Sequence, residues 1–238
     1  FFFFFFFFYY IKKKETLFEQ IPSSHSGISF NNKISENDSL NPLKDINIYN
    51  GGGVGIGDFN NDGFPDIYLT GNMVSNKLYL NKGNFKFEDV TNIAKVGGEG
   101  RWCSGVSVID INSDGLLDIS VCVTGSPKPK KRQNLLYVNQ GIDKNGIPHF
   151  KEMAAEYGLN DTSYSTMATF FDYDNDGDLD MYLSVNEILP NENPNIIRPI
   201  ITDGSFPSTG KLFRNDFNKR LNHPVFTDVS KQAGITTE

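Results

Sequence analysis

Apolar and polar residues alternate with a period near two along much of the chain. The alternating segments are short and rich in β-branched and aromatic residues, as in 66–69 and 118–123. This pattern predicts short β-strands separated by turns, because successive side chains of a strand point to opposite faces of the sheet. Helical turns are expected only in three short segments, 91–95, 154–158 and 230–234. The sequence therefore predicts an all-β fold.

Three sequence signatures recur in the same order along the chain. The first is a nonamer, found as DFNNDGFPD at 58–66, DINSDGLLD at 110–118 and DYDNDGDLD at 172–180. The second has the form NKLYLNKG and begins at Asn76, at Asn134 and, in a looser copy, at Gly210. The third begins at a closing phenylalanine, Phe87, Phe150 or Phe226. A fixed order of signatures indicates one supersecondary unit per repeat, and each unit reads as four antiparallel strands, the make-up of a propeller blade.

The spacing of the signatures divides the chain into three blades, at 51–98, 99–160 and 161–236. Residues 15–50 form a lead-in, and within it 17–28 resembles another copy of the closing signature. We expect an orphan closing strand there. Closed propellers have about 4–8 blades. The sequence thus predicts a partial β-propeller of about three four-stranded blades, with the missing blades belonging to a longer chain.

Residues 1–14 stand apart from this pattern. Eight phenylalanines and two tyrosines precede a run of lysines, and no methionine begins the sequence. The segment lacks strand or helix periodicity, and we interpret it as the remnant of a secretory signal, although no basic n-region or cleavage site accompanies it. A low-complexity segment or a sequence-assembly artefact is the alternative. Export would place the protein outside the cell, at the cell surface or in association with an outer membrane.

The nonamer has the pattern D-x-[DN]-x-D-G-x-x-D, which places side-chain oxygens at positions 1, 3, 5 and 9 and a turn-forming glycine at position 6. Oxygen-only ligation selects a hard cation, and a loop with five or more oxygens suits Ca²⁺ better than Mg²⁺. The predicted metal ligands are these side chains and the backbone carbonyl at position 7. They are Asp58, Asn60, Asp62, Phe64 and Asp66; Asp110, Asn112, Asp114, Leu116 and Asp118; and Asp172, Asp174, Asp176, Asp178 and Asp180.

The nonamer has two other interpretations, an EF-hand loop and a turn that binds no metal. An EF-hand requires a carboxylate at position 12, where this chain has Leu69, Val121 and Leu183, so a helix–loop–helix calcium sensor is excluded. A turn rich in Asp and Asn that binds no metal stays open as the alternative. If the loops do bind calcium, the third should bind it most tightly because it carries four carboxylate ligands.

The composition argues against several classes of protein. The 238 residues carry a formal charge of −7, with 29 acidic against 22 basic residues, which is opposite to the basic surface of a nucleic-acid binder. No stretch approaches the roughly 20 apolar residues of a membrane span. Cys103 and Cys122 are too few for a disulfide framework. His25, His149 and His223 are far apart in sequence, and no catalytic motif accompanies them.

Two further segments are candidate binding loops. The basic run SPKPKKR at 126–132 is expected to be a solvated loop, with contact to an anionic polymer as the alternative. The insertion at 187–210 is rich in proline and long enough to be a binding loop.

The nonamers with their flanking strands, as in GGGVGIGDFNNDGFPDIYLTGN, resemble the FG-GAP or VCBS repeats of the integrin-α-type β-propeller. The NKLYLNKG and FEDVT segments more narrowly resemble bacterial proteins related to cartilage acidic protein, which often carry an ASPIC and UnbV domain. The resemblance covers about 15–238, except that Thr70, Gly71 and Asn72 replace the "GAP" tripeptide and no ASPIC and UnbV segment is found. It implies a seven-bladed propeller with calcium in loops that join the first two strands of a blade.

We therefore expect a non-enzymatic, calcium-binding propeller module that serves adhesion or binds a protein or glycan ligand. Nucleic acid is not an expected partner. The alternative is a polysaccharide-active enzyme built on a propeller.

Overall fold

The computed structural model describes residues 17–38, 40–43, 48–186 and 200–237. Residues 1–14 and 187–199, for which a signal segment and part of a binding loop were predicted, lie outside the described residues. Within the described part, twelve strands form three four-stranded antiparallel sheets. The first sheet has the strand order β1 (Val54–Gly57), β2 (Asp66–Leu69), β3 (Lys77–Asn81) and β4 (Phe87–Asp89).

The other two sheets repeat this strand order. The second consists of β5 (Trp102–Ile109), β6 (Asp118–Thr124), β7 (Leu135–Ile142) and β8 (Pro148–Glu152). The third consists of β9 (Ser165–Phe171), β10 (Asp180–Val185), β11 (Lys211–Asn218) and β12 (His223–Asp228). Every strand pairs with its neighbour in sequence, so each sheet is an antiparallel meander. The prediction of an all-β, partial β-propeller is confirmed.

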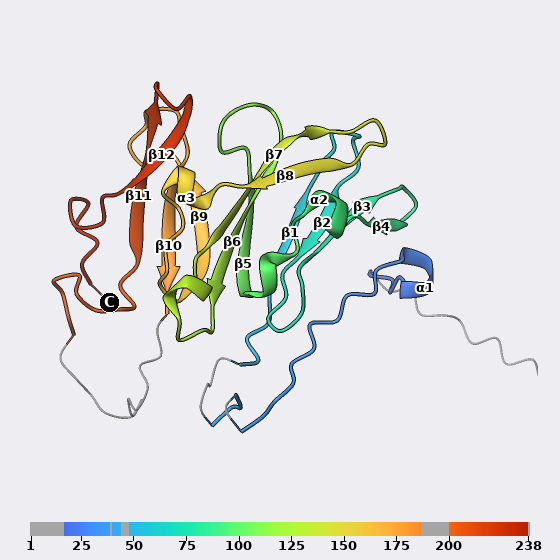
Figure 1. Ribbon diagram of the computed structural model, residues 1–238, viewed down its shortest axis with the longest axis horizontal. Coiled ribbons are helices and arrows are strands. Elements are labelled where there is room, and N and C mark those ends of the chain that lie inside the picture. Colours follow the sequence, from blue (N-terminus) through green and yellow to red (C-terminus); the bar gives the residue numbers. More distant parts are fainter. Residues whose placement is uncertain (1–16, 39, 44–47, 187–199, 238) are drawn as a thin grey trace, which may run out of the picture.

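The three sheets lie side by side (Figure 1), and their first strands contact one another in the order β1, β5, β9. Gly55 of β1 permits this close approach, because a Cβ there would lie 2.8 Å from Cγ2 of Val108. One apolar cluster packs between the first and second sheets, and another between the second and third. The two cysteines are buried and free, with Cys103 in the first cluster and Cys122 in the second.

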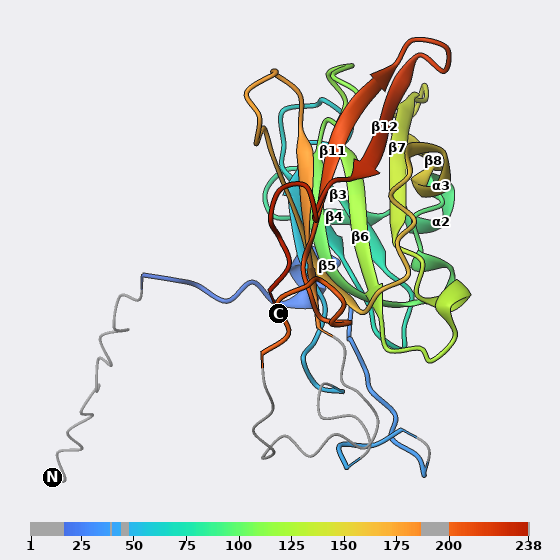
Figure 2. The ribbon, with the colours of Figure 1, turned by 90° about the vertical axis from the view of Figure 1, so that its left-hand side faces the viewer.

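The connections fall on two opposite edges of the sheets. The nonamer loops join the first and second strands of each sheet and lie along the upper edge in Figure 1, and the view in Figure 2 agrees. The described parts of the links from the second to the third strand lie along the lower edge, as does the labelled C-terminus. In an antiparallel meander successive turns must alternate between edges. The nonamer loops and these links are therefore separated by the length of the strands.

A single helical turn follows the closing strand of the first two sheets, as the sequence predicts. These turns are α2 (Thr91–Ala94) and α3 (Ala154–Tyr157), and two short 3₁₀ turns lie at Gly98–Gly100 and Pro129–Lys131. In the third copy, residues 230–234 form a hydrogen-bonded turn rather than a helix. None of the helices in the described residues is long and apolar enough to span a membrane.

The lead-in differs from the prediction of an orphan closing strand. Residues 17–28 contain no strand, and instead form a helical turn, α1 (Ser23–Ser26). A closing strand needs a third strand to pair with, and here Leu17 and Phe18 are largely exposed. The helical turn that follows the closing phenylalanine in the first two blades nevertheless has a counterpart in the lead-in, at α1. Gly27, after α1, lies against the carbonyl oxygen of Phe87, and Gly158, after α3, lies against that of Phe226. A Cβ added to either glycine would lie 2.7 Å from that oxygen.

We predict that Gly158→Ala destabilises the protein more than Gly146→Ala. Both glycines have left-handed backbone, with φ of 75° and 77°. Alanine costs about 1–2 kcal/mol in that conformation. Only at Gly158 would the new Cβ also meet a backbone oxygen, since nothing lies within 4 Å of a Cβ at Gly146. Urea unfolding of both variants measures the difference, and equal losses would show that the contact with Phe226 is unimportant.

Candidate metal centre

The first aspartate of each nonamer closes its loop. Asp58 accepts hydrogen bonds from the backbone amides of Asp62 (3.0 Å) and Gly63 (2.8 Å). Asp110 and Asp172 make the same pair of contacts with positions 5 and 6 of their loops, at 2.8–3.2 Å. The residue at position 4 and the glycine at position 6 have positive φ in all three loops, which turns the backbone tightly. The three nonamers therefore share one conformation.

The residue at position 3 differs between the loops. In the first, Asn60 donates from Nδ2 to Oδ2 of Asp62 at 3.0 Å, and in the second Asn112 donates to Asp114 at 2.9 Å. In the third loop Asp174 takes this place, and a carboxylate cannot donate a hydrogen bond to the next carboxylate. The third loop thus exchanges an internal hydrogen bond for an additional negative charge.

The aspartate at position 9 has a structural role that the sequence analysis did not assign. Asp66, Asp118 and Asp180 are fully buried. One carboxylate oxygen of each accepts the backbone amide of position 2 in its own loop, at 2.9–3.0 Å. The other accepts the amide of an asparagine on the third strand, at 2.7–2.8 Å. Each carboxylate therefore ties its loop to the neighbouring strand.

The asparagines of the third strands complete this tie. They are Asn81, Asn139 and Asn215, and their side-chain amides donate to the carbonyl oxygens of Pro65, Leu117 and Leu179 at position 8, at 2.9–3.3 Å. Asn139 also donates to the carbonyl oxygen of Phe59 in the first nonamer loop, at 3.0 Å, which links two sheets. These three residues were missed as site residues, although an asparagine at the same place in every copy of the second signature was the available signal.

Burial has a clear electrostatic effect on two of the position-9 carboxylates. It raises the pKa of Asp66 to about 6 and that of Asp118 to about 7, although the two amide hydrogen bonds act in the opposite direction. The nearby acids at positions 1 and 5 raise both pKa values further. The loops therefore hold acidic groups whose negative charge is incompletely compensated.

The third loop gathers its acids most closely. One carboxylate oxygen from each of Asp172, Asp174 and Asp176 lies within 4.8 Å of the others, and all three side chains are exposed. Among the described residues, this is the one group of three or more potential His, Cys, Asp or Glu ligands at that distance, and Asp180 is not part of it. Desolvation by nearby protein atoms and then the adjacent carboxylates raise the pKa of Asp174, and the same causes raise that of Asp178 to about 6.

The donor set fits a hard cation. All side chains offered by the three loops at positions 1, 3 and 5 present oxygen atoms, which Ca²⁺ prefers as ligands. Oδ1 of Asn60 and Oδ1 of Asp178 are buried without a hydrogen-bond partner. A buried oxygen without a partner is unfavourable, and a cation would satisfy it. Calcium ligation by the fifteen predicted residues stays a prediction.

Comparison with known proteins agrees with this repeat structure. Residues 36–121, which include the first two nonamers, match the family described as FG-GAP-like repeat. The chain carries FG-GAP-like repeats. A similar curated protein is Cartilage acidic protein 1 from Xenopus tropicalis, 28% identical over 140 residues. The match covers 58% of this chain but only 20% of that relative. The matched part of this chain thus spans about a fifth of the relative's length.

We predict that Asp118→Asn destabilises the FG-GAP repeats in metal-free buffer. Asparagine has the same shape, but its amide nitrogen would face a backbone N–H that now donates to a carboxylate oxygen. Leaving one buried amide without its acceptor costs about 1–3 kcal/mol. The measurement is the free energy of unfolding in urea with chelator present.

Asp174→Asn is the matched control. It removes a negative charge from an equivalent loop but leaves the position-9 ties intact, and asparagine already occupies this position in the other two loops. Its stability should equal or exceed that of the original protein. Equal stabilities for both variants would contradict the structural role of Asp118.

Proposed function

We propose that this chain is a calcium-stabilised, non-enzymatic propeller module of an exported or cell-surface protein, which binds a protein or glycan ligand. The observation that carries the proposal is the carboxylate cluster of Asp172, Asp174 and Asp176 within a loop conformation that occurs three times. The FG-GAP-like repeats support a propeller module, because repeated blades provide a rigid scaffold whose connections present ligand sites.

Electrostatic repulsion supports a cation in these loops. Eleven of the 29 acidic residues lie in the three nonamers. Few cationic side chains neutralise them, since the ion pairs of the described residues join other acids, such as Lys77 with Asp89 and Lys211 with Asp161. Divalent ions in the loops would lower this repulsion and stabilise the folded state by mass action.

Calcium is a better fit than magnesium. The loops offer several carboxylate and amide oxygens, as Ca²⁺ requires, whereas Mg²⁺ retains several of its water molecules and needs a stricter octahedral geometry. Extracellular calcium modules have dissociation constants of about 10⁻⁴–10⁻³ M. Exposed loops with this affinity would be filled where calcium is millimolar, which supports export.

The three histidines lie in separate surroundings. His25 contacts the carbonyl oxygen of Asn84 at 2.9 Å, and His149 lies 3.5 Å from Asp143. The ring of His223 stacks on Tyr157 with centroids 4.6 Å apart. Each histidine thus packs in a different part of the structure, and no two of them form a shared site.

We predict that calcium raises the thermal unfolding midpoint of the 238-residue chain by several degrees. Five millimolar Ca²⁺ should contribute about 1–2 kcal/mol for each occupied loop at the affinities typical of extracellular modules. Equal Mg²⁺ should have a much smaller effect, and chelator should reverse the rise. Identical midpoints in calcium and in chelator, with a cooperative transition in both, would show that the nonamers are turns without a metal.

We also predict that Asp174→Asn weakens binding at the third loop. Isothermal titration with CaCl₂ should show the tightest phase lost or weakened about tenfold, because one of the clustered carboxylates is removed. The metal-free midpoint should stay the same or rise, since the variant relieves repulsion. Glu36→Gln, which removes an exposed acid outside the nonamers, serves as the control and should leave the titration unchanged.

A further inference from the structure

A cavity of about 1000 Å³ lies between the second and third sheets, at the edge opposite the nonamer loops. Its walls come from connections that are far apart in sequence: β6 to β7, β8 to β9, β10 to β11, and the segment after β12. The residues of interest are Arg132, Asp203, Thr209, Lys211, Asp228 and Ser230. Its volume is at the upper end of the range for small-molecule sites.

Arg132 is the unusual charge in this cavity. Only 9% of the residue is exposed. Its Nε donates to the carbonyl oxygen of Thr162 at 3.0 Å, its Nη1 donates to that of Ser126 at 2.5 Å, and the guanidinium lies 4.0 Å from the centre of the Tyr164 ring. It forms no ion pair with a carboxylate in the described part of the chain, where two carbonyl oxygens and an aromatic ring hold the positive charge in place. The guanidinium has five N–H donors, and these contacts leave some of them free for a ligand.

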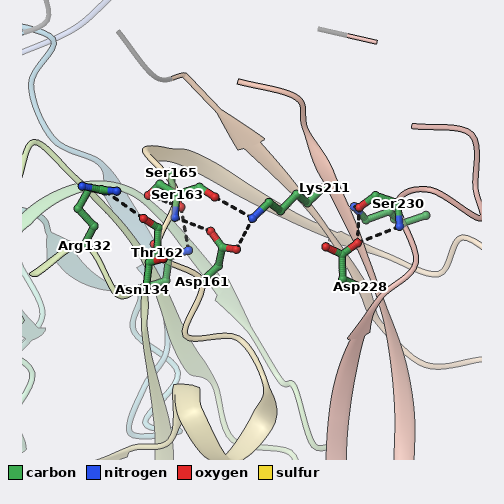
Figure 3. Close-up of polar contacts among 10 residues, drawn as sticks. Arg132, Asn134, Asp161, Thr162, Ser163, Ser165, Lys211, Asp228 and Ser230 are labelled. Atoms are coloured by element: carbon green, nitrogen blue, oxygen red, sulfur yellow. Dashed lines mark hydrogen bonds and ion pairs between the residues drawn. The ribbon is translucent and has the colours of Figure 1, made fainter. Parts of the chain in front are cut away.

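Most of the other charges that line the cavity have partners, and the positive charge of Lys231, which also lines it, acts on Asp203. Lys211 donates to Asp161 at 2.5 Å and to Oγ of Ser163 at 2.8 Å, as Figure 3 shows. Asp228 accepts two hydrogen bonds from Ser230, also drawn in Figure 3. Asp203 accepts the amide of Ser205, and this hydrogen bonding lowers the pKa of its carboxyl. Arg132 is therefore the buried cation on this wall that is available to an anion.

Thr209 supplies an independent sign of a ligand. The residue is 6% exposed and lines the cavity, yet its Oγ1 is buried without a hydrogen-bond partner. Such an orphaned hydroxyl is costly unless something else satisfies it. A hydroxyl group of a ligand could both donate to it and accept from it.

The basic run next to Arg132 extends the positive surface. Lys128, Lys130 and Lys131 are exposed, and none forms an ion pair with a residue in the described ranges. They directly precede Arg132 in sequence, so the run singled out in the sequence continues from the cavity onto the surface. A polymer seated at Arg132 could pass over these lysines.

We propose that this cavity binds an acidic sugar of a glycan, with the sugar carboxylate on Arg132. The inference rests on the binding role proposed above and names the class of ligand. Guanidinium groups bind carboxylates through paired N–H donors. Asp203 and Asp228 line the same cavity and would accept hydrogen bonds from sugar hydroxyls, which the side chains of an acidic peptide do not offer. A buried guanidinium beside acidic acceptors therefore favours a ligand that has both a carboxylate and hydroxyl groups, as a uronic acid has, over a peptide.

The test uses a tetrasaccharide of glucuronate, its carboxyl-reduced counterpart and a hexaglutamate peptide, each titrated calorimetrically into the full chain in excess calcium. The acidic sugar should bind, and the reduced sugar should bind at least tenfold more weakly because its carboxylate is gone. Hexaglutamate should also bind at least tenfold more weakly. Equal affinity for both sugars, equal or tighter binding of the peptide, or no binding of the acidic sugar would overturn the proposal.

Variants assign the binding to this cavity. Arg132→Gln should weaken binding at least tenfold, and Thr209→Val about two- to tenfold. Thr209→Val removes only a hydroxyl that has no partner, so its thermal midpoint should not fall, and this keeps the test valid if Arg132→Gln is unstable. Arg220→Gln removes a positive charge at the β11–β12 turn, on the edge of the nonamer loops, and should leave the affinity for tetraglucuronate unchanged. Unchanged affinity in folded Thr209→Val or Arg132→Gln would contradict the assignment.

The calcium test separates this proposal from the previous one. Calcium stabilisation without binding of tetraglucuronate would refute the acidic-sugar site and leave the calcium module standing. Binding of tetraglucuronate that depends on Arg132, together with no effect of calcium, would refute the calcium module and leave the acidic-sugar site standing. Arg132→Gln should retain the full calcium-induced rise in the thermal midpoint.

Discussion

The structure of each repeat depends on one buried carboxylate that accepts two backbone amides. Asp66, Asp118 and Asp180 join the start of their own loop to the third strand, so the loop, the second strand and the third strand are fixed together. A buried charge is costly unless it is hydrogen-bonded, and here two backbone amides offset part of that cost. The same tie in all three repeats holds the start of each nonamer in one conformation.

This preformed loop changes how a cation would act. The carboxylates at positions 1 and 5 accept amides of their own loop, so their oxygens are already gathered at the surface. A ligand set that is organised before binding loses less conformational entropy when the ion arrives. The mutual repulsion of the exposed acids is the cost of this arrangement, and it is greatest in the third loop, where Asp174 replaces the asparagine of the other two.

The sequence predicts what is local and repeated, and it misses what depends on partners distant in the chain. Period-two alternation and the nonamers were enough to predict the strands and the loops, because both are set by residues close in sequence. The tie to Asn139 was not predicted, since it depends on how β6 pairs with β7. The strand expected within 17–28 does not form for a related reason, because it has no adjacent third strand to pair with. The cavity at Arg132 could not be predicted either, since four separate connections make its walls.

The alternation of turns in a meander separates the two kinds of site. The turn between first and second strands and the link between second and third strands must lie at opposite edges, so repeated acidic loops occupy one edge and variable links occupy the other. The loops are nearly identical because each must satisfy the same tie to Asn81, Asn139 or Asn215. The links carry no such constraint and can differ in length and charge. A cation at the nonamers would therefore act on ligand binding through the stability of the sheets rather than by touching the ligand.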